Sequence, residues 1–186
     1  MERVRQFFSA ILAGMLIGMG GTVFLSQSNP VVGSFLFAIG LFTIVVFQLH
    51  LFTGKVGYTP FNKPVYLIEL VVTWLGNLVG TWITATMVRN SRIYEGMAER
   101  VAGMAEVKLS DDFTSIFLLA VFCGMLMFIA VDCFRNVQGS TLRFIGVFVP
   151  VMVFILSGFE HVIANMFISQ TLTETTPFPM FRQTQL

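Results

Sequence analysis

Five apolar stretches of about 20 residues constrain the fold of this chain more than any other feature. They cover residues 7–25, 31–51, 65–88, 113–134 and 142–168. An α-helix of this length crosses the hydrocarbon core of a bilayer, whereas a lone strand cannot satisfy its backbone there. The sequence therefore predicts an all-α membrane protein, with residues 1–186 forming a single transmembrane domain of five spans.

The composition agrees with lipid as the main solvent. The 186 residues are 55% hydrophobic and 11% charged, with a mean hydropathy of +0.81, whereas soluble domains carry about 25% charged residues. The net charge of +1 provides no basic stripe for phosphates, which argues against a nucleic-acid partner. Cys123 and Cys133 lie in one span, too far apart for a disulfide and without the spacing of metal ligands. We expect neither a metal nor a cofactor.

The distribution of basic residues predicts the orientation in the membrane. With the N-terminus in the cytoplasm, five basic residues lie outside, mostly in a long connector that is also acidic. The six on the cytoplasmic side are Arg3, Arg5, Lys55, Lys63, Arg135 and Arg143.

Two histidines lie at matching places in the second and fifth stretches. Residues 53–54 (Thr-Gly) follow His50, and residues 157–158 (Ser-Gly) precede His161. Small and polar residues at these points favour interrupted helices, and paired interruptions in an inverted repeat indicate a pathway near the bilayer midplane.

His161 has two polar neighbours inside its apolar stretch, Glu160 and Asn165. Ionisable groups within a span usually face a cavity and serve a function, so we predict that His161 faces a pathway. The alternative is a structural histidine, either interfacial or hydrogen-bonded. For His50 both interpretations stay open.

Three motifs carry a resemblance to a known family. They are "SGFEHVIANMF" at residues 157–167, "LFTG" at 51–54 and "WLGNLVG" at 74–80. Together they resemble the formate/nitrite transporter family of bacterial anion channels, over residues 8–168. The resemblance implies an aquaporin-like inverted-repeat protomer with broken second and fifth spans. It also implies a homopentamer in the bacterial cytoplasmic (inner) membrane, with one pore per protomer for formate, nitrite, hydrosulfide or similar anions.

The same resemblance suggests roles for individual residues. His161 matches the central pore histidine, Thr53 the threonine that faces it, and Lys108 a lysine that lends the pathway positive potential. Asn165 matches the polar residue beyond the histidine, and Glu160 is expected to brace the broken helix. The apolar constrictions match Leu41, Leu51 and Phe52 on the cytoplasmic side, and Phe37 and Phe154 on the outer side. Without the motifs, ordinary helix packing would explain all five of these apolar residues.

A proton relay fits these roles. Two apolar slits make the passage of a naked anion costly, whereas a protonated weak acid loses little by leaving water. A histidine between the slits, with an unperturbed pKa of about 6.5, could lend that proton. Lys108 would attract anions to the pathway.

The chain departs from the family pattern at several positions. His50 replaces an acidic residue, Gly124 stands where an asparagine is common, and Asp132 lies within the fourth span. For Asp132 we favour an ion pair with Arg135. After Ile168 the sequence turns polar, so no sixth span is expected; a shortened member, a helix supplied by a second chain and a truncated product all remain open.

Two functions from different classes follow. The first is a channel or proton-coupled transporter for small monovalent anions. The second is a non-transporting scaffold subunit of a membrane complex, which needs a partner chain for the sixth span. An intramembrane enzyme is disfavoured because the sequence contains no His-Glu-x-x-His motif, no nucleophilic serine context and no paired aspartates.

Overall fold

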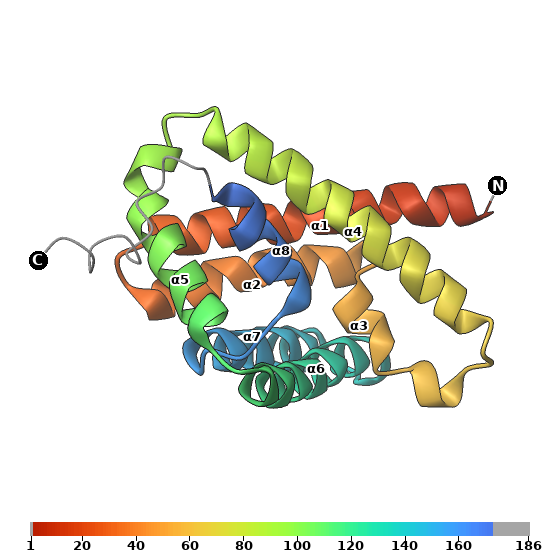
Figure 1. Cartoon of the computed structure of the whole chain (residues 1–186). Helices are drawn as coiled ribbons and strands as arrows, with labels where there is room; N and C mark the ends of the chain where they lie inside the picture. Colours follow the sequence, from red (N-terminus) through yellow and green to blue (C-terminus); the bar gives the residue numbers. More distant parts are fainter. Residues whose placement is uncertain (1, 173–186) are drawn as a thin grey trace, which may run out of the picture.

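The computed structural model describes residues 2–172, which are helical throughout their regular structure and contain no strand. Figure 1 shows the helices in chain order. They are α1 (Glu2–Ser26), α2 (Pro30–Val46), α3 (Phe52–Val56), α4 (Tyr66–Arg89), α5 (Ala98–Ser110), α6 (Phe113–Asn136), α7 (Ser140–Leu156) and α8 (Val162–Thr171). Short 3₁₀ turns lie at Thr59–Phe61 and Tyr94–Gly96.

The order of long and broken helices repeats along the chain. Helices α1, α4 and α6 are each long and apolar enough to cross a membrane, whereas α2 and α7 are shorter. A non-helical break follows each of the shorter helices, and a second, short helix then completes the span: α3 after α2, and α8 after α7. The prediction of an all-α membrane fold with broken second and fifth spans is therefore confirmed.

Each break contains a residue in the left-handed region of backbone space. Gly158 has a φ of 71°, and Gln48 has a φ of 53°. Glycine adopts this conformation readily because it has no Cβ, whereas a non-glycine residue is uncommon there. Glycine therefore ends α7 at little conformational cost, while the α2 break depends on contacts from the surrounding helices.

Glycines allow α1 and α4 to pack with their backbones in contact. A Cβ on Gly14 would lie 2.3 Å from the carbonyl oxygen of Asn77, and one on Gly80 would lie 2.1 Å from that of Ile11. Only glycine fits at such distances, and small residues at helix crossings drive close association in lipid. Gly14 of α1 and Gly80 of α4 thus fix α4, and with it Asn77, against α1.

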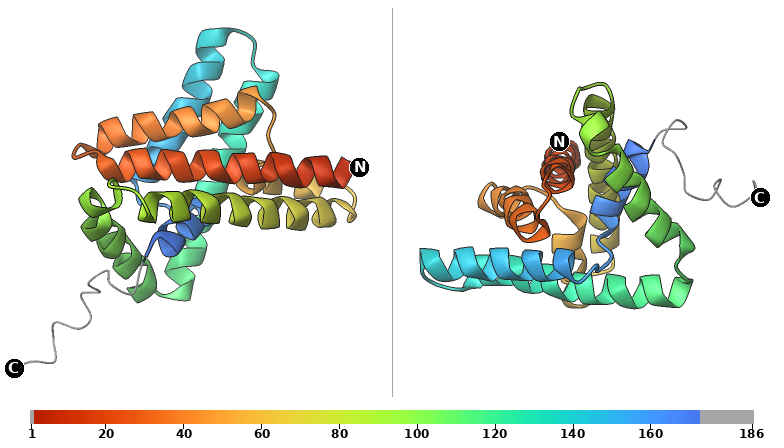
Figure 2. Two further views of the ribbon diagram at one scale, coloured as in Figure 1. Left: turned by 90° about the horizontal axis from the view of Figure 1, so that it is seen from above. Right: turned by 90° about the vertical axis from the view of Figure 1, so that its left-hand side faces the viewer.

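The core lies where the two halves of the repeat meet. Figure 2 shows α6 and α7 side by side as a layer across α1 and α2. One apolar cluster, which includes Phe37, Leu41, Phe148 and Val151, joins α2 to α7. Helix α5 closes one end of the bundle against α8. Most of the polar segment after Ile168, where we expect no sixth span, lies outside the described residues.

Candidate functional site

His161 is the N-cap of α8 and links the two broken spans. Its Nδ1 accepts a hydrogen bond of 3.1 Å from the Ala164 N–H, and its Nε2 lies 2.9 Å from Oγ1 of Thr53 in α3. A neutral imidazole has one acceptor and one donor nitrogen. Because Nδ1 accepts, Nε2 carries the hydrogen and donates it to Thr53. The side chain is 2% exposed.

Two phenylalanines continue from the His161 ring. The ring of Phe154 stacks on it with 5.3 Å between centroids, and Phe37 meets Phe154 edge-on at 6.0 Å. These three side chains line a cavity of about 70 Å³ together with Lys108 and Asn165. We call this cavity the distal cavity. It brings together five of the residues that the sequence singled out.

A second, larger cavity lies toward the end of the bundle that holds the N-terminus. This N-side vestibule has a volume of about 520 Å³, and the buried side chains of Leu41 and Leu51 form part of its wall. Phe52, expected beside them, does not line it and packs against the core cluster instead. Gly54, next to Thr53, also lines the vestibule, and His161 lines the distal cavity, so the Thr53–His161 contact joins the walls of the two cavities.

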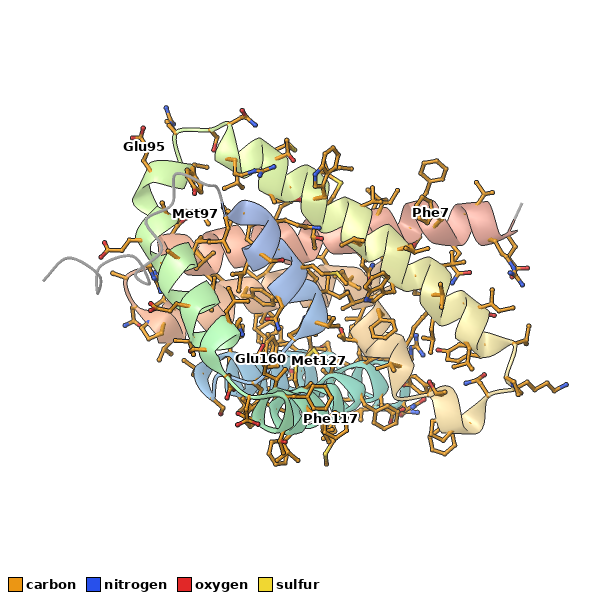
Figure 3. All side chains as sticks on the ribbon, in the orientation of Figure 1. Phe7, Glu95, Met97, Phe117, Met127 and Glu160 are labelled. Atoms are coloured by element: carbon orange, nitrogen blue, oxygen red, sulfur yellow. The ribbon has the colours of Figure 1, made fainter. Side chains whose placement is uncertain are left out.

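Glu160 lies at the α7–α8 break, close to the end of α5 (Figure 3). Nζ of Lys108 lies 2.6 and 2.7 Å from its two carboxylate oxygens, and the Asn165 amide also donates to it. Glu160, itself in the break, therefore contacts both α5 and α8. The same pairing offsets the positive charge that Lys108 would otherwise lend to the distal cavity.

Replacing Lys108 by methionine should lower the free energy of unfolding by about 1 to 2 kcal/mol, because it leaves a largely buried carboxylate with one amide partner. The estimate is reduced because the Lys108 side chain is 20% exposed. The double variant Lys108→Met/Glu160→Gln should recover much of this loss. A double-mutant cycle on thermal unfolding in detergent measures the coupling, and additive losses would contradict a structural ion pair.

Asn77 holds the break of the second span, a role that the sequence analysis did not assign. Its amide donates to the carbonyls of Ala10 at 2.8 Å and His50 at 3.0 Å, and its oxygen accepts from the Phe52 N–H at 2.9 Å. The side chain is fully buried. A buried amide inside a span signals a specific partner, but sequence alone does not show that the partner is the backbone of the break.

The structure also places the residues at which the chain departs from the family pattern. His50 lines the N-side vestibule and an adjoining groove. Gly124 lines a surface groove between α3 and α6 and neither of the two cavities described above. The predicted Asp132–Arg135 ion pair is wrong: Asp132 accepts from Tyr58 at 3.1 Å and from Asn136 at 2.8 Å.

Metal-binding groups do not gather anywhere in residues 2–172. No group of three or more His, Cys, Asp or Glu side chains in this range could hold an ion. Cys123 is buried and Cys133 is half-buried, and both are free thiols. The described groups at the site are one imidazole, the Lys108–Glu160 ion pair, a hydroxyl and an amide that form hydrogen bonds, and apolar side chains.

Comparison with known proteins places this arrangement in a family. The sequence model described as formate/nitrite transporter matches residues 1–183. The formate channel FocB of Escherichia coli (strain K12) is 27% identical over 192 residues, covering 90% of this chain and 66% of that protein. The nitrite transporter NirC of the same strain is 27% identical over 174 residues, covering 85% of this chain and 65% of that protein. The chain thus spans somewhat less than two thirds of these curated relatives.

A solved structure gives the same answer for the fold. It is a pentameric formate channel with formate bound, and it is 26% identical to this chain. The two superpose with a TM-score of 0.77, over 91% of this chain and 74% of the channel.

Proposed function

Because this chain belongs to the formate/nitrite transporter family, we propose that it conducts small monovalent anions such as formate, nitrite or hydrosulfide. The observation that carries the proposal is the Thr53–His161 contact, which joins the two broken spans: His161 lines the distal cavity, and Gly54, next to Thr53, lines the N-side vestibule. A multi-pass membrane protein without transport would gain little from two interrupted helices, because each leaves backbone groups without intrahelical partners. Discontinuous helices that meet at mid-depth are typical of transport pathways.

Apolar confinement and hydrogen-bond donors would together determine which anions pass. The Phe37–Phe154 pair and the two leucines Leu41 and Leu51 would remove water from a passing ion. The free-energy cost of this dehydration rises steeply with the charge of the ion. Backbone N–H groups in the first turn of α8 and the adjacent Thr53 hydroxyl would offset part of that cost. A small ion of single charge satisfies both conditions.

A proton relay through His161 is the finer part of the proposal. With Nε2–H bonded to Thr53, an incoming proton would have to bind Nδ1 and displace the Ala164 N–H. Protonation would therefore open the N-cap of α8. Neutral acid formed beside the ring would then cross the apolar slits more easily than its anion.

Uptake into proteoliposomes tests the proposal directly. The purified chain should carry formate, nitrite, hydrosulfide and short carboxylates at rates well above protein-free vesicles. A thermal unfolding measurement first establishes that the protein is folded. If the folded protein then takes up none of these anions, the transport function is refuted.

We further propose a homopentamer with five separate pores, in the bacterial inner membrane with the N-terminus in the cytoplasm. The pentameric relative and the bias of basic residues support this arrangement. Native mass spectrometry in mild detergent should show five chains. Monomers or dimers alone would contradict it.

The scaffold function keeps one observation in its favour. In the most apolar 18-residue stretch of α6 only 22% of the residues are buried, whereas 44% are buried in the corresponding stretch of α1 and 39% in that of α4. Side chains such as Phe117, visible in Figure 3, stay exposed, and a Cβ on Gly124 would touch nothing. A helix from a second chain could cover this face, as α4 covers α1. Transport by the chain alone would rule out the need for such a partner.

A further inference from the structure

The N-side vestibule carries three cations that form no ion pair with a described carboxylate. Lys55, Arg135 and Arg143 line it, and no Asp or Glu does. The one ion pair among the described side chains joins Lys108 to Glu160 at the opposite cavity. The two ends of the proposed pathway therefore differ: the distal cation is paired, and the N-side cations are not.

Neighbouring acidic groups lie elsewhere. Asp132 accepts hydrogen bonds from Tyr58 and Asn136. Glu69 lines the adjoining groove rather than the vestibule, and its charge acts on Lys55 from there without forming an ion pair. His50, which lines both spaces, adds a further nitrogen-bearing side chain. The vestibule thus presents donors and positive charge with no competing anion in its wall.

Contacts with aromatic rings and backbone hold the two guanidinium groups. Nε of Arg143 donates to the carbonyl of Val137 at 2.8 Å, and its guanidinium lies 5.8 Å from the Phe134 ring centroid. The guanidinium of Arg135 lies 5.2 Å from the Tyr58 ring centroid. Positioned guanidinium groups lose less conformational entropy on binding an oxyanion than free ones. The terminal nitrogens of Arg143 have no hydrogen bond within residues 2–172.

From this arrangement we infer that the N-side vestibule is a binding site for a divalent oxyanion, with sulfate as the simplest example. Attraction to fixed cations rises in proportion to the charge of the anion. The cost of dehydration in an apolar slit rises with the square of the charge. A divalent anion is therefore bound more strongly in the vestibule than a monovalent one. Its passage beyond Leu41 and Leu51 is opposed by an even larger increase in the cost of dehydration.

Block of transport follows, and this step rests on the proposed function. A divalent anion held in the vestibule occupies the space through which a monovalent anion must pass. Sulfate on the N-side of the membrane should then inhibit formate flux. Sulfate on the other side, where Lys108 is paired, should not.

Equilibrium dialysis of radiolabelled sulfate against the detergent-purified chain at low ionic strength tests the site without transport. Saturable binding is expected, and Lys55→Gln should weaken it about tenfold through loss of a charge-assisted contact. Lys55 suits the test because its Nζ makes no hydrogen bond within the described residues. Lys63→Gln is the matched control: it removes the same charge from an exposed position outside the vestibule and should leave binding unchanged.

The outcomes separate the two proposals. Binding that Lys55→Gln weakens and Lys63→Gln does not supports the site, even if the chain transports nothing. Absent saturable binding, or equal weakening by both variants, would overturn the inference while leaving anion transport intact. Inhibition of formate flux by sulfate from both sides equally, in vesicles with one protein orientation, would overturn the sidedness.

Discussion

Replacing Asn77 by leucine should destabilise the protein by about 2 to 5 kcal/mol, the sum expected for three hydrogen bonds inside a membrane at about 0.6 to 1.7 kcal/mol each. The upper part of the range applies here, because the His50 carbonyl and the Phe52 N–H belong to a break and have no helical partner. Leucine has the same branched arrangement of four side-chain heavy atoms as asparagine but bulkier methyl groups, so the variant removes the hydrogen bonds without opening a cavity. Reversible unfolding by a denaturing detergent measures the change.

Thr81→Val provides the matched control in the same helix. Thr81 is also fully buried, but its hydroxyl donates only to the Leu78 carbonyl of its own helix. Its loss should reduce the free energy of unfolding by less than about 1 kcal/mol. Equal losses for Asn77→Leu and Thr81→Val would show that Asn77 is an ordinary buried polar residue and does not hold the break.

The pattern of apolar stretches was enough to predict the fold class, and the residues next to the two histidines were enough to predict that the second and fifth spans break. The predicted point was right for Ser157 and Gly158, whereas Thr53 and Gly54 lie inside α3 and the break of the second span precedes them, at residues 47–51. Both signals are local: span length follows from bilayer thickness, and a break follows from residues next to it in sequence. The break after Val46 nevertheless contains Gln48 in a left-handed conformation, and no glycine at this position indicates that conformation in the sequence. Asn77 stabilises that break from 27 residues away, and such a partner is fixed only by packing.

Side-chain direction was the least predictable feature. Neighbouring residues on a helix point about 100° apart. A sequence motif therefore predicts how far along a span a residue lies more reliably than it predicts which face of the helix carries its side chain. Gly124 lines a surface groove, and Asp132 bonds to Tyr58 of the loop after α3 rather than to Arg135. By contrast, Glu160 and His161 are adjacent and diverge as expected, one toward Lys108 and the other toward Thr53.

Formate flux through the wild-type protein should rise several-fold as the external pH falls from about 8 to 5, and His161→Phe should flatten this dependence. An imidazole takes up a proton more readily as the pH falls and can pass it to formate beside the ring, and the neutral acid crosses an apolar slit far more easily than the anion. Phenylalanine would keep the stack on Phe154 but remove both ring nitrogens. Proteoliposomes loaded at fixed internal pH measure the profile.

His161→Phe also removes the N-cap of α8, so a loss of flux could come from structure alone. His161→Asn separates the two effects, because an asparagine caps a helix well but cannot take up a proton near neutral pH. A relay predicts that His161→Asn conducts with a flattened pH profile, and that Thr53→Ser, which keeps the hydroxyl and the imidazole, retains the wild-type slope. If His161→Asn follows the wild-type profile, no proton passes through the ring. His161 then acts only by capping α8 and binding Thr53, and the rise in flux at low pH reflects the acid in solution.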